Sequence, residues 1–216
     1  MKKVVLIHAT QLAMQPICDA FEELWPDANI THLLDEELSI RRSQVDELTS
    51  DLYRRVTSLV ELAMLSGADA VMFTCSAFGD AIEHAKKTVD IPVLKPNEAM
   101  FEEAIKSPKD VILMGTFPPA MEGMAEEFRS SFSSDTKRQF DLVCLPSARE
   151  VLKEGRTDVH NDIHLQEALK HQDKLIMLAH FSSSVAKPML SSNTTNVVLS
   201  APHSAVKKLK ERLLKH

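Results

Sequence analysis

The stretch DAVMFTCSAFGDAIE, residues 69–83, decides the fold because a strand pattern passes directly into a helix pattern within it. Its first part, DAVMFT, is a short aliphatic run of the kind that forms a strand buried on both faces. Cys75 closes that run, and the small and polar residues after it begin a helical pattern. A strand followed at once by a helix is the unit from which parallel α/β folds are built.

The same unit recurs along the whole chain. Helical patterns fill most of the gaps between strand runs, and the longest extends from about Ser43 to Ser66, with one apolar stripe and a stop at Gly67. The sequence therefore predicts an α/β protein with parallel strands. The predicted strands are residues 4–8, 29–34, 69–74, 92–94, 111–115, 140–145, 175–179 and 197–200.

The second half of the chain resembles the first at a nearly constant distance, and self-similarity at a fixed period marks a structural repeat. We therefore expect two similar parallel-sheet α/β lobes related by pseudo-two-fold symmetry, with the active site in the cleft between them. The matching segments are VVLIHAT and VILMGT, ending at Thr10 and Thr116; DAVMFTCSAFGDAIE and KLIMLAHFSSSVAKPML, centred on Cys75 and His180; and VLKPNEA and VLSAPHSA, starting at Val93 and Val198.

Composition narrows the class of protein. The chain has 216 residues, of which 44% are hydrophobic and 26% charged, as in ordinary globular proteins. A net charge of -6 argues against nucleic-acid binding, and the apolar start VVLIH is too short for a membrane span or a signal peptide. Three widely spaced cysteines without a secretory signal predict reduced thiols and a cytoplasmic location.

Two candidate acid/base groups stand at equivalent strand ends. Cys75 precedes a predicted helix, so we expect the helix N-terminus to lower the pKa of its thiol; a buried, inert cysteine is the alternative. His180 stands at the matching point of the second half, where a lone histidine would usually be structural. As a pair on opposite walls of a cleft they predict two-base catalysis, in which one group removes a proton and the other returns one.

Polar and aromatic residues at the same strand ends are candidates for substrate binding, and several of them are also suited to capping helices. Cys18 and Cys144 lie inside predicted elements and are expected to be packing residues. Phosphate-binding glycine motifs and close-spaced metal-ligand motifs are missing from the sequence, so neither a nucleotide nor a metal is expected. The predicted substrate-binding residues are His8, Thr10, Gln11, Ser76, Thr116, Phe117, Phe181 and Ser182.

The segment GADAVMFTCSAFGDAIE, residues 67–83, resembles the aspartate/glutamate/hydantoin racemase superfamily, which also contains maleate isomerase and arylmalonate decarboxylase. The resemblance spans nearly the whole chain. It implies a two-lobed, pseudo-symmetric enzyme without a cofactor, with Cys75 as the first catalytic cysteine and Ser76 as a ligand of the substrate carboxylate. It further implies that the C-terminal segment returns to the first lobe, which places residues 1–94 and 200–216 in one lobe and 95–199 in the other.

The sequence departs from that family at two strand ends. Where its racemases carry a second cysteine, usually in Gly-Cys-Thr, this chain has Ala179, His180 and Phe181. The turn from His8 to Thr10 also differs from the glutamate racemase pattern. The two-thiol mechanism therefore does not transfer intact, and the decarboxylase branch of the family lacks one of the two cysteines as well.

The leading functional prediction is a cofactor-independent racemase or isomerase that removes a proton next to a carboxylate or carbonyl. Its substrate would be a small amino acid, a hydantoin or a dicarboxylate-like compound. The alternatives are a one-cysteine decarboxylase, a thiol hydrolase in which His180 activates Cys75, and a non-catalytic small-molecule binder. A small carboxylate-bearing substrate is the expected partner, nucleic acid and membrane are not, and homo-oligomerisation is left open.

Overall fold

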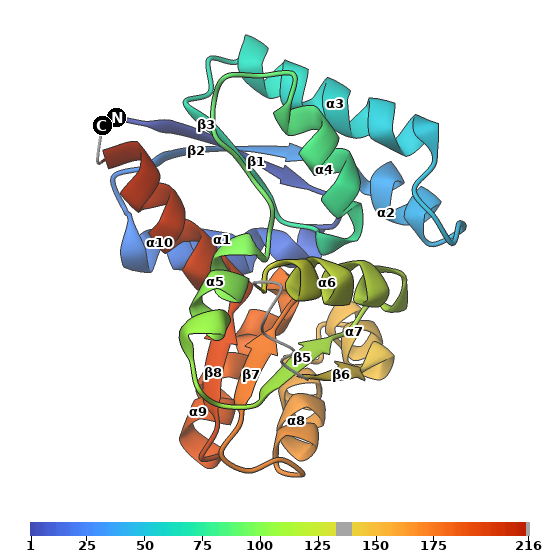
Figure 1. The fold of residues 1–216 in the computed structure, drawn as a ribbon, viewed down its shortest axis with the longest axis vertical. Coiled ribbons are helices and arrows are strands. Elements are labelled where there is room, and N and C mark those ends of the chain that lie inside the picture. The colour runs from blue at the N-terminus through green and yellow to red at the C-terminus, as the bar shows by residue number, and fades with distance from the viewer. Residues whose placement is uncertain (133–139, 215–216) are drawn as a thin grey trace.

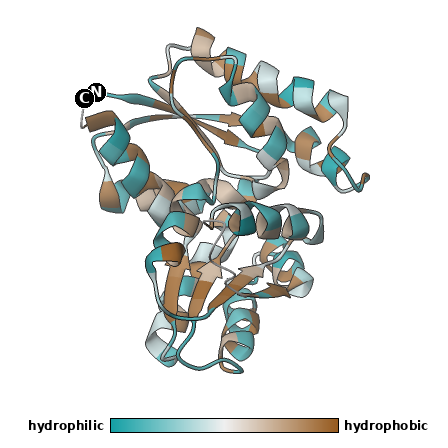
Figure 2. Ribbon diagram, viewed as in Figure 1, coloured by the Kyte–Doolittle hydropathy of each residue, from teal (hydrophilic) through white to brown (hydrophobic). Residues whose placement is uncertain are grey.

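The protein has two lobes, one above the other in Figure 1, each built on a four-stranded parallel sheet. The computed structural model describes residues 1–132 and 140–214. Helices cover the sheets, and the strands carry the most hydrophobic segments while polar residues face outward on the helices (Figure 2). This layered arrangement confirms the predicted fold class.

The first sheet has the order β2-β1-β3-β4. Its strands are β1 (Lys3–His8), β2 (Asn29–Leu34), β3 (Ala70–Phe73) and β4 (Val93–Leu94). The strand ends of β1 and β3 lie side by side, with Ile7 opposite Phe73. The helical elements of this half are η1 (Gln11–Ala13), α1 (Met14–Leu24), α2 (Glu36–Arg42), α3 (Ser50–Leu65), η2 (Ser76–Phe78) and α4 (Gly79–Lys86).

The second sheet has the order β6-β5-β7-β8, which repeats the first sheet strand for strand. Its strands are β5 (Val111–Gly115), β6 (Phe140–Cys144), β7 (Leu175–Leu178) and β8 (Val197–Ser200). The two identical orders confirm the repeat predicted from the sequence. The remaining helical elements are α5 (Glu98–Lys106), α6 (Pro118–Ser130), α7 (Pro146–Lys153), α8 (Thr157–Ala168), η3 (Phe181–Ala186), α9 (Lys187–Asn193) and α10 (Ala201–Leu214).

The long helix expected from about Ser43 begins later than predicted. α3 starts at Ser50, where the Thr49 side chain accepts a hydrogen bond from the Leu52 N–H at 3.4 Å. Val45 and Leu48, which extended the apolar stripe in the sequence, lie in the loop before this cap and pack against the core from there. A periodic apolar pattern thus continued past a helix end because the adjoining loop also covers the core.

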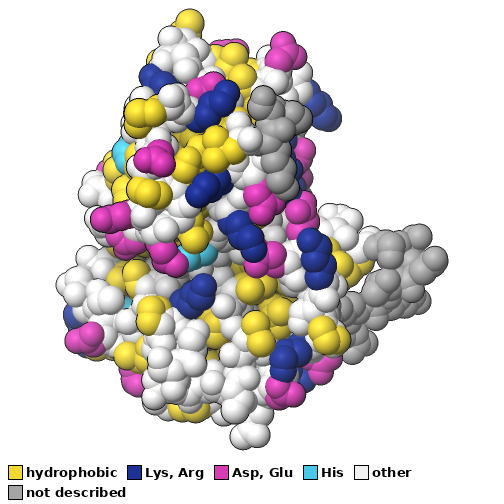
Figure 3. Space-filling view, turned by 90° about the vertical axis from the view of Figure 1, so that its left-hand side faces the viewer, with side chains coloured by type: hydrophobic (Ala, Val, Ile, Leu, Met, Phe, Trp, Pro, Cys, Tyr) yellow, Lys and Arg dark blue, Asp and Glu magenta, His cyan; other side chains and the backbone are white. Residues whose placement is uncertain are grey.

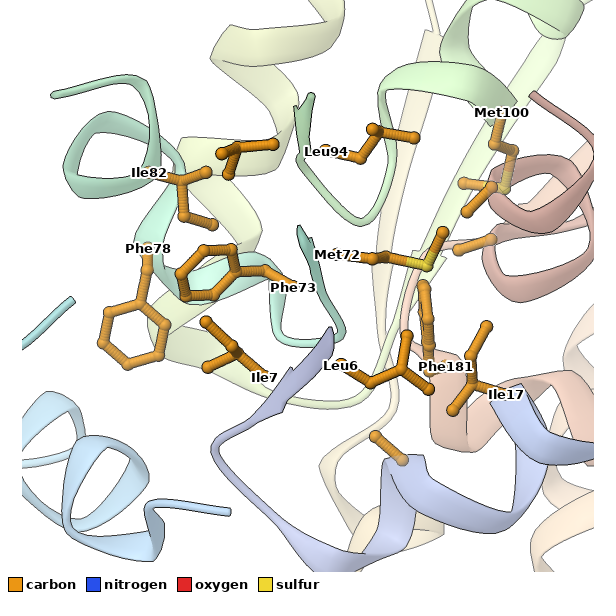
Figure 4. Close-up of a cluster of buried hydrophobic side chains, with 14 of the residues drawn as sticks. Leu6, Ile7, Ile17, Met72, Phe73, Phe78, Ile82, Leu94, Met100 and Phe181 are labelled. Carbon is orange, nitrogen blue, oxygen red and sulfur yellow. The ribbon is translucent and has the colours of Figure 1, made fainter. Parts of the chain in front are cut away.

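The main hydrophobic core runs through both lobes. It includes Leu6 and Phe73 of the first half together with Leu113 and Phe181 of the second. Figure 4 shows Phe181 close to Ile17 of α1, so a residue of the second half packs against the first. A smaller cluster lies behind the second sheet around Ile112 and Ile176. Because the lobes share packed apolar surface, they are held in a defined mutual position.

The C-terminal helix α10 packs against α1, and it also packs against α5. This placement agrees with a C-terminal segment that returns to the first lobe, although the lobe boundaries 1–94, 95–199 and 200–216 stay a prediction. Residues 215–216 of the predicted segment lie outside the described residues. Basic and acidic side chains are interspersed over the face in Figure 3. Among residues 1–132 and 140–214, no helix is both long and apolar enough to span a bilayer.

Candidate active site

Cys75 lies just beyond β3 and caps the 3-10 turn η2. The residue before it, Thr74, is fixed by its N–H, which donates to the Ile7 carbonyl at 3.0 Å. Burial raises the pKa of the Cys75 thiol, and this effect outweighs the Ala77 N–H and the charges of Arg149 and Arg42, which favour the thiolate. The prediction of a lowered pKa was therefore wrong. A short 3-10 turn replaces the expected helix start, and desolvation dominates.

His180 occupies the equivalent place beyond β7 and caps η3. Its Nδ1 accepts a hydrogen bond of 2.9 Å from the backbone N–H of Thr116. Burial lowers the pKa of His180 to about 3, helped by the charges of Arg149 and His164. The imidazole is consequently neutral at physiological pH, and because Nδ1 is an acceptor the ring proton resides on Nε2. That Nε2 is buried and has no protein partner.

Gly115 provides the space in which this imidazole rests. A Cβ atom at Gly115 would lie 2.9 Å from Cε1 of His180 and 2.5 Å from Sδ of Met121. Side-chain atoms do not approach that closely without displacement, so the end of β5 must stay free of a side chain. In the first half the corresponding residue is Ala9, which is buried. The position of the His180 imidazole therefore requires a residue without a side chain at position 115.

Two arginines that the sequence did not single out contribute charge at this site. Arg149, on α7, lowers the pKa values of both Cys75 and His180. Its guanidinium lies over the Phe117 ring, 4.8 Å from the ring centre. Since one cation influences both groups, the thiol and the imidazole share an electrostatic environment across the two halves of the chain. No pattern in the sequence distinguishes Arg149 from the other helical cations.

The second arginine, Arg42, joins the two lobes at the end of α2. Its Nε donates to the Ala77 carbonyl at 3.3 Å, Nη1 to Val45 at 2.7 Å and Nη2 to Pro119 at 2.5 Å. The residue is only 8% exposed, and no carboxylate in the described part of the chain forms an ion pair with it. A buried cation whose hydrogen bonds go only to carbonyls brings positive charge beside Cys75, and the Asp46 carboxylate acts on it only from beyond ion-pair distance.

The predicted substrate-binding residues fall into two groups. Ser76 is 7% exposed and its Oγ has no partner, while Thr116 is buried beside His180 and Phe117 lies under Arg149. These three adjoin the Cys75 and His180 strand ends. Ser182 follows Phe181 in η3 and is buried. Their contact with a substrate stays a prediction.

The remaining predicted residues have other contacts. Thr10 caps η1 and accepts from the Leu12 N–H at 3.4 Å, and the exposed Gln11 donates to Glu36 at 3.3 Å. Phe181 is 1% exposed and belongs to the shared core. Each of these three side chains therefore has a contact within the protein. Their predicted role in binding substrate stays a prediction.

His8 is fully buried in a chain of hydrogen bonds that sequence reasoning missed. Its Nδ1 lies 2.8 Å from Oγ1 of Thr74, and its Nε2 lies 2.9 Å from Nδ1 of His32. The chain ends at Cys18, whose Sγ is 3.8 Å from Nε2 of His32. Burial, and then the neighbouring His32, lower the pKa of His8 to about 4. Both ring nitrogens of His8 are therefore engaged, and its predicted contact with substrate remains untested.

A groove of about 740 Å³ opens at the boundary between the lobes. Residues next to the candidate catalytic groups line it, including Arg42, Ser76 and Pro119, but Cys75 and His180 do not. The thiol and the imidazole thus lie outside the lining of the groove, and both residues are partly exposed. Within residues 1–132 and 140–214, no cluster of three or more His, Cys, Asp or Glu side chains is arranged to hold a metal ion.

Comparison with solved structures identifies the fold. Glutamate racemase isoform RacE1 from Bacillus anthracis aligns with 99% of this chain and 82% of its own, at a TM-score of 0.75 and 16% identity. Glutamate racemase from Francisella tularensis, in complex with D-glutamate, aligns with 99% of this chain and 81% of its own, at a TM-score of 0.73 and 12% identity. Picrophilus torridus aspartate racemase aligns with 98% of this chain and 94% of its own, at a TM-score of 0.75 and 12% identity.

These similarities confirm the predicted resemblance at the level of the fold, and at such identities they carry no more than the fold. No family model matches the chain, and no curated protein matches it.

Proposed function

We propose that this chain, which shares the fold of the aspartate and glutamate racemases, is a cofactor-independent isomerase. It would exchange the proton on a carbon next to a carboxylate or carbonyl of a small amino acid, hydantoin or dicarboxylate-like substrate. The observation that carries the proposal is the placement of a partly buried thiol and a partly buried imidazole at equivalent strand ends, with Arg149 acting on both.

In this proposal Cys75 removes the proton from carbon, and a proton returns to the opposite face of the planar carbanion from Nε2 of His180, whose ring is then reprotonated from solvent. The thiolate is the base, and Arg42 and Arg149 stabilise it against the burial that favours the thiol. His180 acts in its neutral form, as a donor from Nε2, because its Nδ1 already accepts the Thr116 N–H. A neutral imidazole of this kind stabilises negative charge that develops on a substrate oxygen.

The substrate carboxylate would be held by Arg42 and by the Oγ of Ser76. Arg42 is buried without a carboxylate partner among the described residues, and a carboxylate ligand would supply one through charge-assisted hydrogen bonds. Ser76 follows Cys75 directly, and its unpartnered hydroxyl can donate to the same ligand. Both groups adjoin Cys75, so a carboxylate bound there would place its α-carbon near the thiol.

A thiol hydrolase is less well supported. That mechanism needs the imidazole to take the proton of the thiol directly. No hydrogen bond joins Sγ of Cys75 to His180, although both residues are described. Nε2 of His180 carries a proton rather than a lone pair in the present arrangement.

Solvent deuterium exchange tests the proposal. We expect the wild-type protein to introduce deuterium at the α-carbon of at least one compound in a panel of amino acids, hydantoins and malonates. Cys75→Ala should lower the rate by about 10³-fold, because acid/base groups contribute factors of this order. Cys144→Ala, at an exposed thiol, is the matched control. Exchange that survives in Cys75→Ala, or absence of exchange from the whole panel, would refute the proposed function.

A one-cysteine decarboxylase is the second candidate, and the raised pKa of Cys75 favours it. A thiol that keeps its proton at neutral pH is ready to protonate the carbanion left after loss of carbon dioxide. Release of carbon dioxide from a substituted malonate, without deuterium exchange into amino acids, would identify this lyase. The cytoplasmic location and the assembly state stay predictions.

A further inference from the structure

The groove at the lobe boundary has a strongly acidic lining. Seven of its residues are acidic and two, Arg42 and Lys95, are basic. Glu122 and Glu126 share the exposed Arg129. Asp46, Glu47 and Asp80 have no ion-pair partner within the described part of the chain, and all three are exposed. The unpaired carboxylates therefore give the groove a negative potential.

The floor of the groove is built from both lobes. Lys95 lies between Glu83 and Glu127, with Nζ 3.0 Å and 3.1 Å from their carboxylate oxygens. Glu127 of α6 reaches the first lobe, where a Cβ on Gly79 would stand 3.4 Å from its Oε2. Lys86 also pairs with Glu83 at 3.0 Å, so these carboxylates are matched by ammonium groups and the unpaired acidic charge of the groove is that of Asp46, Glu47 and Asp80. Tyr53 adds an aromatic ring to the lining.

A second observation points to a ligand. The Oγ of Ser76 is buried, has no partner and belongs to a residue that lines this groove. Buried hydroxyls are normally hydrogen-bonded, so this one awaits a donor or acceptor from a bound molecule or water. Ser76 also adjoins Cys75. The groove is thus continuous in sequence and space with the proposed reaction site.

We propose that the groove receives the distal end of the substrate and selects a compound whose side chain ends in a cation, such as the ammonium of lysine or ornithine. This rests on the proposed function and names its substrate class. The carboxylate end would lie at Ser76 and Arg42, and the cationic end would extend along Asp80, Glu47 and Tyr53. Carboxylates attract the cation and the aromatic ring adds a favourable cation–π contact. A dicarboxylate is repelled by the same residues.

Calorimetric titration at low ionic strength tests the selection without requiring turnover. The probes are L-lysine, L-norleucine and L-glutamate, which differ in the charge at the end of the side chain. L-lysine should bind about tenfold more tightly than L-norleucine, and L-glutamate should bind most weakly. Raising the salt concentration should reduce the difference between lysine and norleucine.

The double variant Glu47→Gln/Asp80→Asn should reduce that preference by about fivefold, since it removes two unpaired charges from the groove. Glu61→Gln/Asp27→Asn removes the same charge from exposed positions outside the groove and should leave the preference within about twofold of the wild type. Glutamate binding as tightly as lysine, no binding of lysine, or equal effects of the two double variants would overturn this substrate class. Cys75-dependent exchange on another compound would still support the proposed function, so the two can fail separately.

Discussion

The same strand end is used differently in the two lobes. In the first lobe β1 delivers an imidazole, His8, which is buried against Thr74 through their side chains. In the second lobe the partner strand β5 delivers only a backbone N–H, that of Thr116, and the imidazole belongs to His180 on the neighbouring strand. Two sheets with the same strand order therefore differ in which strand end carries the histidine.

The comparison explains why both groups rest in neutral forms. Each lies at a strand end where partial burial removes hydration, and the loss of hydration disfavours charge. Burial raises the pKa of the Cys75 thiol and lowers the pKa of the His180 imidazole. The charge that does reach the site comes from Arg42 and Arg149, one from each half. Catalysis would then depend on cations that surround the pair rather than on an ion pair within it.

Acidification should produce the largest effect on stability. Burial lowers the pKa values of His8 in the first lobe and His164 in the second to about 4. Above the unfolded pKa of about 6.5 the neutral forms persist in both states. As the pH falls from there to about 4, the unfolded chain gains protons that the folded chain cannot accept. The free energy of unfolding should fall by on the order of 3 kcal/mol for each histidine.

Denaturant titrations between about pH 7 and pH 4 measure this loss. If the two lobes contribute equally, His8→Asn and His164→Asn should each reduce the pH dependence of the free energy of unfolding by a similar amount. His171→Asn, in the turn after α8 where the imidazole is partly exposed, is the control. A pH dependence unchanged in both buried variants would show that other groups govern acid sensitivity.

Replacing His180 by asparagine should separate the roles of its two ring nitrogens. The side-chain oxygen of the introduced asparagine can accept the Thr116 N–H as Nδ1 of His180 does, whereas the Nε2 donor is lost. We expect deuterium exchange to slow by about 100-fold, equivalent to about 2.7 kcal/mol, with little change in the midpoint of thermal unfolding. Exchange at the wild-type rate would restrict His180 to a structural role.

The architecture was predictable because its signal is carried by many residues. Buried strands such as VILMG at 111–115 need unbroken apolar runs. Because the sequence repeats, each strand predicted in one half was supported by an equivalent strand in the other. The start of α3 was misplaced because Val45 and Leu48 pack on the core from a loop. Periodicity reports which residues are buried, and a loop that lies on the core has the same composition as a helix face.

The electrostatics of the site were much less predictable. The positions of Cys75 and His180 followed from strand ends, but the pKa direction of the thiol depends on burial and on contacts remote in sequence. Arg42 meets Pro119 across 77 positions, and no local pattern marks either residue. The chain from Thr74 through His8 and His32 to Cys18 likewise requires three-dimensional neighbours. Such contacts are fixed by tertiary packing.

Gly115 and Ala9 offer a reciprocal test of the two strand ends. Gly115→Ala would force a methyl group against the His180 ring and Met121, so it should destabilise the protein by about 2 kcal/mol and slow exchange. Ala9→Gly removes a buried methyl group from the first lobe and should cost only about 1 kcal/mol. Thermal and denaturant unfolding of both variants gives the comparison. Equal losses would mean that the imidazole does not need the space that the glycine leaves.

The smallest expected effect concerns Arg149, the cation whose charge acts on both Cys75 and His180. Arg149→Gln removes a positive charge that lowers the pKa values of both Cys75 and His180, so both values should rise. The pH profile for iodoacetamide alkylation of Cys75 should shift to higher pH, measured with Cys18 and Cys144 replaced by alanine. Exchange should slow by about tenfold, or about 1.4 kcal/mol, because less thiolate is available.

Arg156→Gln removes an exposed cation from the same lobe and should leave both measurements unchanged. The two readouts of Arg149→Gln distinguish its possible roles. A slower exchange with an unshifted alkylation profile would place Arg149 on the substrate alone, and the thiol would then be independent of the second lobe. A shifted profile requires that the charge of one lobe reaches the thiol of the other, which is the condition for a single site built from two equivalent strand ends.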